Sequence, residues 1–249
     1  MDAVTFDFWN TLIYEERGHL KGRRLAAWAR LLEEAGFPAE REALDAVYDR
    51  AWDTYVRSWH ANEQFVAVAA ATQIVEDLGY PMSEGLRQQL IAAFTTAIHD
   101  ADVHATPHVG DCLERLRSAG VVLGVICDVG FTPSRVLRVF LDKHGLLDFF
   151  SAFSFSDEVG HYKPAPQIFE HALAALGNPV PERVAHVGDI SRTDVAGAKA
   201  MGMIAIRYTG ISDDNPAPAA GSPSGSPDAP PADFVVDSHD QVPAVLGLG

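Results

Sequence analysis

Residues 3–13, Ala3-Val4-Thr5-Phe6-Asp7-Phe8-Trp9-Asn10-Thr11-Leu12-Ile13, form an apolar run that contains one carboxylate and ends in a turn sequence. The alternating Val4, Phe6 and Phe8 predict a short buried strand, and Asn10-Thr11 predicts the turn that ends it. A carboxylate is costly to bury unless it is paired, hydrogen-bonded or bound to a metal. Asp7 is therefore a candidate functional residue at the end of this strand.

The composition predicts a globular enzyme-sized chain. It has 249 residues, of which 47% are hydrophobic and 21% charged, enough for one core and a smaller appendage. A formal charge of −15 argues against a nucleic-acid partner, because phosphate backbones are bound by clustered Lys and Arg. Two cysteines, Cys112 and Cys127, are too few for a disulfide framework or a zinc cluster.

Targeting features are not found in the sequence. No apolar run approaches the roughly 20 residues that a membrane span requires. Met1-Asp2 leads directly into the first predicted strand, without the basic start and cleavage site of a signal peptide. We therefore expect a cytoplasmic protein without a membrane partner, and the sequence leaves its oligomeric state open.

Residues 15–104 carry apolar positions at helical spacing and predict four helices with short connections, as in a small bundle. Trp52, Tyr55 and Trp59 share one face of the second of these helices. We expect all three to pack in the core, the alternative being that one faces a substrate.

Four basic residues gather at the start of this helical segment. A run of charges usually forms a solvated face, so we expect these side chains to be solvated, with contact to an anionic substrate as the alternative. They are Arg17, Lys21, Arg23 and Arg24.

From Pro107 onward, helices and strands alternate, which predicts a doubly wound parallel sheet of the α/β, Rossmann-like class. The first strand must join this sheet, so the predicted core comprises residues 1–14 and 105–249, with residues 15–104 as an insertion. Residues 213–233 are rich in Pro, Ala, Ser and Gly and predict a flexible loop within the core. An edge strand is expected at 233–237.

Four predicted strand ends present polar residues at one edge of this sheet, where open parallel sheets bind ligands. Asp7 follows the first strand, and Cys127-Asp128 follows the strand of residues 121–126. Lys163 follows the next strand, and Gly188-Asp189 ends a later one, with Asp194 five residues further on. Together they form a candidate site.

In this order the four motifs resemble those of the haloacid dehalogenase-like (HAD) hydrolase superfamily. The family's first motif is a strand ending in Asp-x-Asp-x-Thr, which residues 6–12 match with Asp7 retained. The lysine of the third motif is matched by Lys163, and the Gly-Asp-x4-Asp of the fourth by Gly188-Asp189 and Asp194. The resemblance covers essentially the whole chain and identifies residues 15–104 as a helical cap.

The resemblance implies a phosphatase acting on a small phosphorylated molecule through an aspartyl-phosphate on Asp7. It implies Mg²⁺ held by Asp7, the backbone carbonyl of Trp9, Asp189 and possibly Asp194. For Asp194 the alternative is helix N-capping. Lys163 is expected to act in catalysis and to hold the phosphoryl oxygens.

The second motif contributes Cys127 and Asp128 as candidate phosphate-binding residues. The family has Ser or Thr where this chain has Cys127, and a thiol is a weak donor that most often fills a buried site. The carboxylate of Asp128 would repel a phosphate unless it points away or hydrogen-bonds the loop at Gly130.

Trp9 is the main departure from the family pattern, since it occupies the position of the Asp that protonates the leaving group and activates water. Indole does neither, and such acid–base catalysis contributes about 10²–10⁴-fold. Glu15, Glu16 and His19 follow the motif and are candidate replacements, the alternative being a solvated linker.

Two other functions remain open. In HAD dehalogenases an aromatic residue stands at the position of Trp9, and Asp7 would displace halide from a 2-haloacid without a metal; Asp189 and Asp194 argue against this. A weak or inactive binding protein is the third possibility, suggested by Trp9 and Cys127 together.

Overall fold

A computed structural model of the chain describes residues 1–212 and 229–248. The described chain forms two compact units. The first comprises Met1–Tyr14, His104–Asp128 and Phe140–Gly249, and the second comprises Glu15–Val103 and Val129–Val139. The predicted division differs from this one because it places residues 129–139 in the core.

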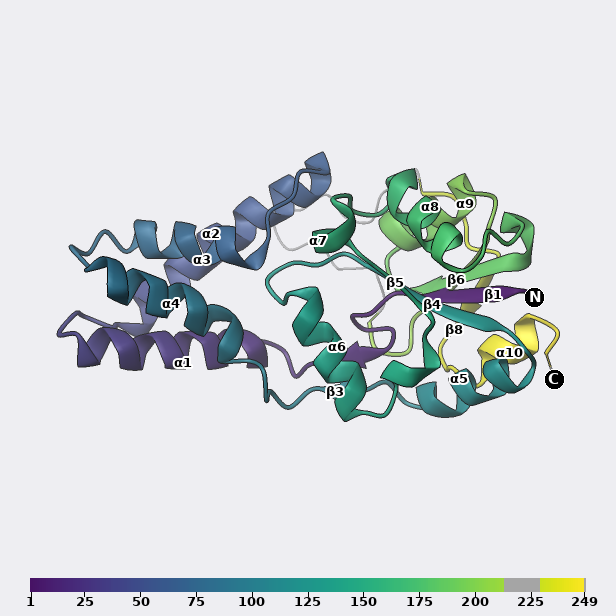
Figure 1. The fold of residues 1–249 in the computed structure, drawn as a ribbon, viewed down its shortest axis with the longest axis horizontal. Coiled ribbons are helices and arrows are strands. Elements are labelled where there is room, and N and C mark those ends of the chain that lie inside the picture. The colour runs from purple at the N-terminus through teal and green to yellow at the C-terminus, as the bar shows by residue number, and fades with distance from the viewer. Residues whose placement is uncertain (213–228, 249) are drawn as a thin grey trace. The chain divides into compact units, whose positions relative to one another are not determined.

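The described part of the first unit is built on a six-stranded parallel sheet with the order β5-β4-β1-β6-β7-β8 (Figure 1). Its strands are β1 (Ala3–Phe6), β4 (Val122–Cys127), β5 (Ala152–Phe155), β6 (Val184–Gly188), β7 (Ile204–Tyr208) and β8 (Phe234–Val236). The central strands are almost wholly buried, as expected for a parallel sheet covered on both faces. The doubly wound α/β fold is therefore confirmed.

Helices cover both faces of this sheet. Figure 1 shows α5 and α10 on one side and α8 and α9 on the other. Their bounds are α5 (Val109–Ser118), α8 (Pro166–Ala175), α9 (Ala196–Ala200) and α10 (Gln241–Val245). α7 (Ser156–Val159) follows β5, and α6 (Ser134–Lys143) begins in the second unit and ends in the first. Short 3₁₀ turns lie at Leu147–Phe149 and Pro181–Arg183.

The register of β1 fixes the position of the candidate site. Phe6 pairs with Val125 of β4 on one side and with Val187 of β6 on the other. The residues that follow these three strands therefore meet at the same edge of the sheet.

The turn after β1 is held by a small antiparallel sheet that the sequence did not predict. It pairs β2 (Ile13–Tyr14) with β3 (His104–Ala105). The carbonyl oxygen of Thr11 accepts hydrogen bonds from the Thr106 hydroxyl at 2.7 Å and from Nε2 of the buried His239 at 2.7 Å. His239 comes from the C-terminal segment, and burial lowers its pKa to about 4, so the ring is neutral at pH 7.

The second unit contains the four predicted helices in the described part of the chain. They are α1 (His19–Glu34), α2 (Arg41–Ala61), α3 (Ala67–Asp77) and α4 (Glu84–Thr96). Their apolar faces form the core, where the indole nitrogen of buried Trp28 donates to the Leu90 carbonyl at 2.7 Å. Tyr55 is buried as predicted, but Trp52 is 45% exposed, so the prediction that it is a core residue is wrong.

Arg24 corrects the expectation of a solvated basic run, because its side chain is buried in this unit. Its Nε donates to the Phe94 carbonyl at 3.0 Å, and Nη2 donates to the carbonyl of Phe131 at 2.9 Å and the hydroxyl of Thr132 at 3.1 Å. The Tyr48 hydroxyl accepts from Nη1 at 3.3 Å. Arg24 therefore fastens the segment after β4 to the helices.

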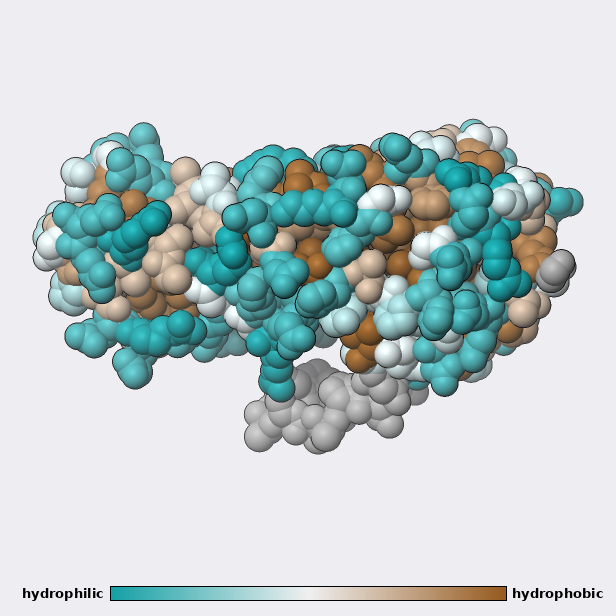
Figure 2. All heavy atoms as spheres, turned by 90° about the horizontal axis from the view of Figure 1, so that it is seen from below, coloured by the Kyte–Doolittle hydropathy of each residue, from teal (hydrophilic) through white to brown (hydrophobic). Residues whose placement is uncertain are grey.

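Part of the predicted flexible loop, residues 213–228, lies outside the described residues. The predicted edge strand is observed as β8. Among the described helices, none combines the length and the apolar character needed to cross a membrane. On the face drawn in Figure 2, hydrophilic residues predominate and hydrophobic ones occur in small patches among them.

Candidate active site

Asp7 occupies the edge of the sheet immediately after β1. Its backbone N–H donates to the Val187 carbonyl at 2.8 Å, which continues the pairing of β1 with β6 by one residue. Its side chain is buried, and Oδ1 accepts a hydrogen bond from Lys163 Nζ at 2.5 Å. Oδ2 has no hydrogen-bond partner among the described residues.

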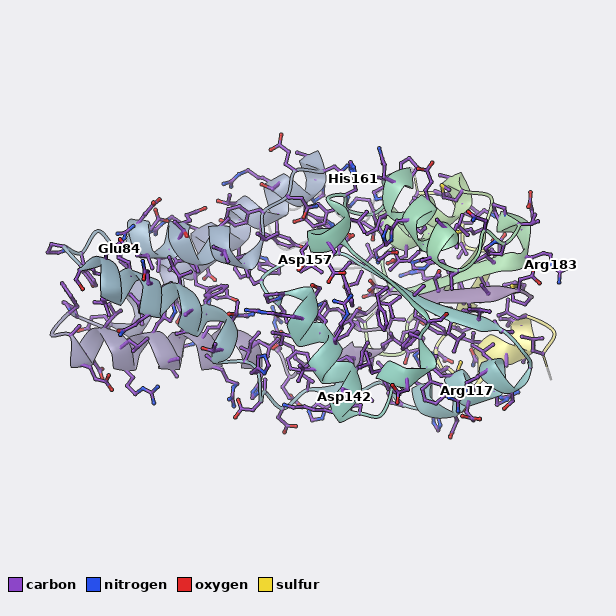
Figure 3. The ribbon with its side chains drawn as sticks, viewed as in Figure 1. Glu84, Arg117, Asp142, Asp157, His161 and Arg183 are labelled. Carbon is purple, nitrogen blue, oxygen red and sulfur yellow. The ribbon has the colours of Figure 1, made fainter. Side chains whose placement is uncertain are left out.

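Lys163 reaches this edge from the segment that follows α7. Figure 3 labels two residues of this stretch, Asp157 on α7 and His161 just after it. The buried Lys163 ammonium donates to Asp7 Oδ1, to Asp194 Oδ1 at 2.6 Å and to the carbonyl of Ile126 at 3.0 Å. Three acceptors use all three N–H groups of an ammonium. Burial acts to lower the pKa of Lys163, but the carboxylates of Asp194 and Asp7 raise it well above its ordinary value.

Asp128 holds the segment that carries Lys163. Its Oδ1 accepts a hydrogen bond from the backbone N–H of Lys163 at 2.8 Å. The neighbouring Cys127 is buried, and its thiol lies 3.5 Å from the Asp128 carbonyl. Burial first, and then the charge of Asp7, raises the pKa of Cys127 well above its ordinary value, so the thiol is neutral. Phosphate binding by Cys127 and Asp128 stays a prediction.

Asp194 lies in a π-helical turn, Ser191–Val195, directly before α9. Its Oδ1 accepts from Lys163 Nζ and from His186 Nε2 at 3.0 Å. Its Oδ2 accepts from the Ile190 backbone at 3.0 Å and from the Thr193 hydroxyl at 3.4 Å. Burial acts to raise the pKa of Asp194, but Lys163 and His186 outweigh it and hold the pKa below its ordinary value. Four protein donors support a role in holding Lys163, and direct metal binding stays a prediction.

Gly188 makes this placement of Asp194 possible. A Cβ atom at residue 188 would lie 2.3 Å from Asp194 Cγ, far inside van der Waals contact. The glycine of the Gly-Asp motif is therefore needed for the close approach of the carboxylate.

Asp189 presents an oxygen atom without a partner. Its Oδ2 accepts from Ser212 Oγ at 3.0 Å and from Asn10 Nδ2 at 3.3 Å. Its Oδ1 is buried and has no hydrogen-bond partner among the described residues. Such an atom is costly unless a ligand satisfies it.

The charges of the site favour a cation. Ligand atoms of Asp7, Asp189 and Asp194 lie within 4.8 Å of one another. The Lys163 ammonium contacts two of these three carboxylates, Asp7 and Asp194. Burial raises the pKa of Asp189 to about 7, with the charge of Asp194 adding to the shift. Burial also raises the pKa of Asp7 well above its ordinary value, although Lys163 opposes the shift. A hard divalent cation such as Mg²⁺ fits this set of carboxylate oxygens and would offset their repulsion.

Trp9 lies next to this cluster in sequence and packs as an aromatic residue. Its half-buried ring contacts Phe8 and Phe140 edge to face, with centroids 5.0 and 6.3 Å apart. The indole gives the described site no proton-transfer group at this position. Metal binding by the Trp9 carbonyl stays a prediction. Glu15 accepts the backbone N–H of Leu20 at the start of α1, at 2.7 Å, so its carboxylate has a structural role.

Three site residues were not identified from the sequence. His186 stands between apolar residues in the middle of β6, and a titratable side chain inside a buried strand is a signal that could have found it. Asn10 and Ser212, which hold Asp189, gave no comparable signal.

Comparison with known families agrees with this geometry. A family model described as haloacid dehalogenase-like hydrolase matches residues 1–202. The chain belongs to this family. The resemblance inferred from the four motifs is thus confirmed, and so is the expectation that the protein is a hydrolase. Within the HAD family, curated relatives and solved structures extend the comparison.

Among curated relatives, the glyceraldehyde 3-phosphate phosphatase of Methanothermobacter thermautotrophicus is 30% identical over 217 residues, which cover 83% of this chain and 84% of that protein. The Escherichia coli pyrimidine 5′-nucleotidase YjjG is 40% identical over 75 residues, covering 30% of this chain and about a third, 32%, of its own length. The first of these relatives is named as a phosphatase and the second as a nucleotidase.

The similar solved structures of this family include phosphatases and dehalogenases. The 2-haloacid dehalogenase of Pseudomonas syringae is 26% identical with a TM-score of 0.70, and 99% of this chain and 98% of that chain are covered. A HAD phosphatase from Thermococcus onnurineus has a TM-score of 0.61 at 22% identity, with the same coverage of 99% and 98%, and shows the fold alone.

Proposed function

We propose that this protein is a Mg²⁺-dependent phosphatase that hydrolyses a small phosphorylated metabolite through an aspartyl-phosphate on Asp7. The observation that carries this proposal is the joint placement of Asp7 and Asp189. Asp7 has one oxygen on Lys163 and the other without a protein partner, and Asp189 adds a buried oxygen that lacks a donor. A metal-free reaction on an anionic substrate gains nothing from this second carboxylate.

Asp7 and Asp189 would hold the Mg²⁺, with Asp194 and the Trp9 carbonyl as further predicted ligands. The bound ion supplies positive charge that lets an anionic nucleophile approach a phosphate dianion. Ser212 and Asn10 orient Asp189 through its other oxygen, which leaves Oδ1 directed to a ligand.

Asp7 Oδ2 is the attacking atom. It forms a bond to phosphorus while the bond from phosphorus to the leaving oxygen breaks, and that oxygen departs with the electron pair. Water then attacks phosphorus, releases inorganic phosphate and regenerates the Asp7 carboxylate. Lys163 stabilises the negative charge that passes through the phosphoryl oxygens, and it must exchange a protein acceptor to do so, because all three of its N–H groups are engaged.

Trp9 determines which leaving groups suit the enzyme. An alkoxide leaves poorly without a proton donor, whereas the oxygen of an aryl or acyl phosphate leaves without one. We therefore infer a preference for substrates with a weakly basic leaving group.

Hydrolysis of 4-nitrophenyl phosphate tests the proposal. Activity should require Mg²⁺, disappear in Asp7→Asn and fall strongly in Asp189→Ala. Asp142→Asn is the matched control, because Asp142 is an exposed aspartate at the C-terminal end of α6, labelled in Figure 3. Turnover that persists unchanged in excess chelator would overturn the proposal.

A 2-haloacid dehalogenase is the second candidate, favoured by the aromatic side chain at residue 9 and by the similarity to the Pseudomonas syringae enzyme. In this reaction the Asp7 carboxylate attacks carbon and expels halide. Halide release from 2-chloropropionate in the presence of chelator would support it. If neither substrate is turned over, a binding protein with this fold is the better interpretation.

A further inference from the structure

His186 is a fully buried imidazole in the middle of β6, and both of its ring nitrogens have polar partners. Nε2 lies 3.0 Å from Asp194 Oδ1, and Nδ1 lies 2.9 Å from the hydroxyl of Thr5 on β1. Phe169 of α8 packs against the imidazole in a T-shaped arrangement, with centroids 5.5 Å apart and planes at 83°. The side chain is therefore fixed from three sides.

The partners determine where the ring proton lies. An ionised carboxylate only accepts hydrogen bonds, so Nε2 must carry the proton that faces Asp194. In the neutral ring, Nδ1 then accepts from the Thr5 hydroxyl at 2.9 Å, in preference to the more distant Ala185 carbonyl at 3.3 Å from the same hydroxyl. In the protonated ring, Nε2 still donates to Asp194. The contact from His186 to Asp194 thus has the same direction in both states of the ring.

Asp194 connects this contact to the reacting groups. Its Oδ1 is shared by His186 and Lys163, and its Oδ2 is held by the Ile190 backbone and the Thr193 hydroxyl. Without the His186 donor, Oδ1 keeps Lys163 as its one partner among the described residues. The position of Oδ1 is then fixed by the mobile lysine side chain alone, while Oδ2 keeps its two donors.

We propose that His186 is a positioning residue that fixes the Asp194 carboxylate and, through it, holds the Lys163 ammonium against Asp7. This inference rests on the proposed function, in which Lys163 stabilises the negative charge of the phosphoryl oxygens. His186 is linked to Lys163 only through Asp194, and Lys163 in turn contacts Asp7. The imidazole therefore does not touch the reacting atoms. The effect on catalysis is therefore one of geometry.

A pair of variants isolates the donor. His186→Gln keeps an amide N–H near the position of Nε2, whereas His186→Met has similar length and no donor. We expect His186→Met to lower kcat on 4-nitrophenyl phosphate by about 10–100-fold with little change in KM, the usual loss when a supporting contact is removed. His186→Gln should recover most of this loss. Equal kcat values for two folded variants would contradict the proposal.

Two further measurements separate this inference from the proposed function. Crystal structures of the two variants should show Lys163 displaced from Asp194 in His186→Met and retained in His186→Gln. In the wild-type protein labelled with ¹⁵N-histidine, NMR should show a proton on Nε2 of His186, assigned by the loss of its signal in His186→Gln. A ring protonated on Nδ1 alone would refute the role even if the methionine variant does not fold. Absence of any phosphatase activity would instead refute the proposed function.

Discussion

Gly188 lies so close to Asp194 that a Cβ atom at residue 188 would be 2.3 Å from the Asp194 Cγ and 2.7 Å from its Oδ1. The carboxylate that holds Lys163 therefore occupies the space of a missing side chain.

Gly188→Ala should displace Asp194 and reduce phosphatase activity at least tenfold, since supporting contacts of this kind contribute about 10–100-fold. We also expect a loss of about 1–3 kcal/mol in the free energy of unfolding from overpacking. Gly22→Ala on α1 is the control, because a Cβ there meets no atom within 4 Å, and it should stabilise the helix by about 0.5–1 kcal/mol. Steady-state kinetics and urea unfolding measure both effects. Unchanged activity in Gly188→Ala would show that Asp194 need not stay where it is.

The metal-free protein should lose stability as the pH rises from about 4 to about 7. Burial raises the pKa of Asp189 to about 7 in the folded protein, whereas the unfolded chain releases this proton near its ordinary pKa of 3.8. The folded state therefore binds the extra proton in this window, and its stability falls by at most about 1.4 kcal/mol per pH unit for this group.

Thermal unfolding in chelator between pH 4 and pH 8 measures this dependence, and Asp189→Asn should flatten it. Added Mg²⁺ should raise the unfolding temperature more at pH 8 than at pH 5, because protons compete with the ion for the same carboxylates. A Mg²⁺ effect of equal size at both pH values would contradict this assignment.

Trp9→Asp should increase the turnover of alkyl phosphates more than that of aryl phosphates. The introduced carboxyl group supplies the proton that an alkoxide needs, and aryl leaving groups depart without it. Trp9→Phe keeps an aromatic ring against Phe140 without an acid and is the control. Parallel measurements of kcat on glycerol 3-phosphate and 4-nitrophenyl phosphate decide the matter. The same gain on both substrates would mean that protonation of the leaving group is not what limits the wild-type enzyme.

Arg24→Lys should destabilise the second unit by about 2–4 kcal/mol. A lysine has no planar fork, so it cannot replace the contacts to Phe94, Phe131 and Thr132, and buried acceptors that lose their donor cost about 1–3 kcal/mol each. Hydrogen exchange should become faster in residues 129–139, which Arg24 fastens to the helices. Arg30→Lys is the control on the same helix, since the Arg30 side chain is 74% exposed. Equal unfolding free energies for the two variants would refute the role of Arg24.

The sequence predicted the sheet well because a parallel sheet is specified by buried apolar runs that end at polar residues. Asp7, Lys163 and Asp189 follow such runs or lie in motifs with fixed spacing, so their common location was predictable. The polarity of Arg24 was misleading, because its acceptors are backbone and hydroxyl oxygens from three distant segments that composition does not reveal.

The partners of individual atoms could not be predicted in the same way. For Asp128 the sequence left two arrangements open, pointing away from the phosphate or bonding the loop at Gly130, and it did not suggest the observed bond from the backbone of Lys163, 35 residues away. The four donors around Asp194 depend on a π-helical turn, whose formation has no short sequence signal. Local patterns therefore identified which residues meet, whereas tertiary packing decides which oxygen each donor faces.

The hydrogen bond from His239 to the Thr11 carbonyl joins the turn after Asp7 to a segment well beyond the stretch that the family model matches, residues 1–202. The matched stretch contains every motif residue, but it does not contain every support of the loop that carries Asp7. Domain boundaries drawn from the family match alone would thus remove His239 and, with it, a buried donor to the turn that follows Asp7.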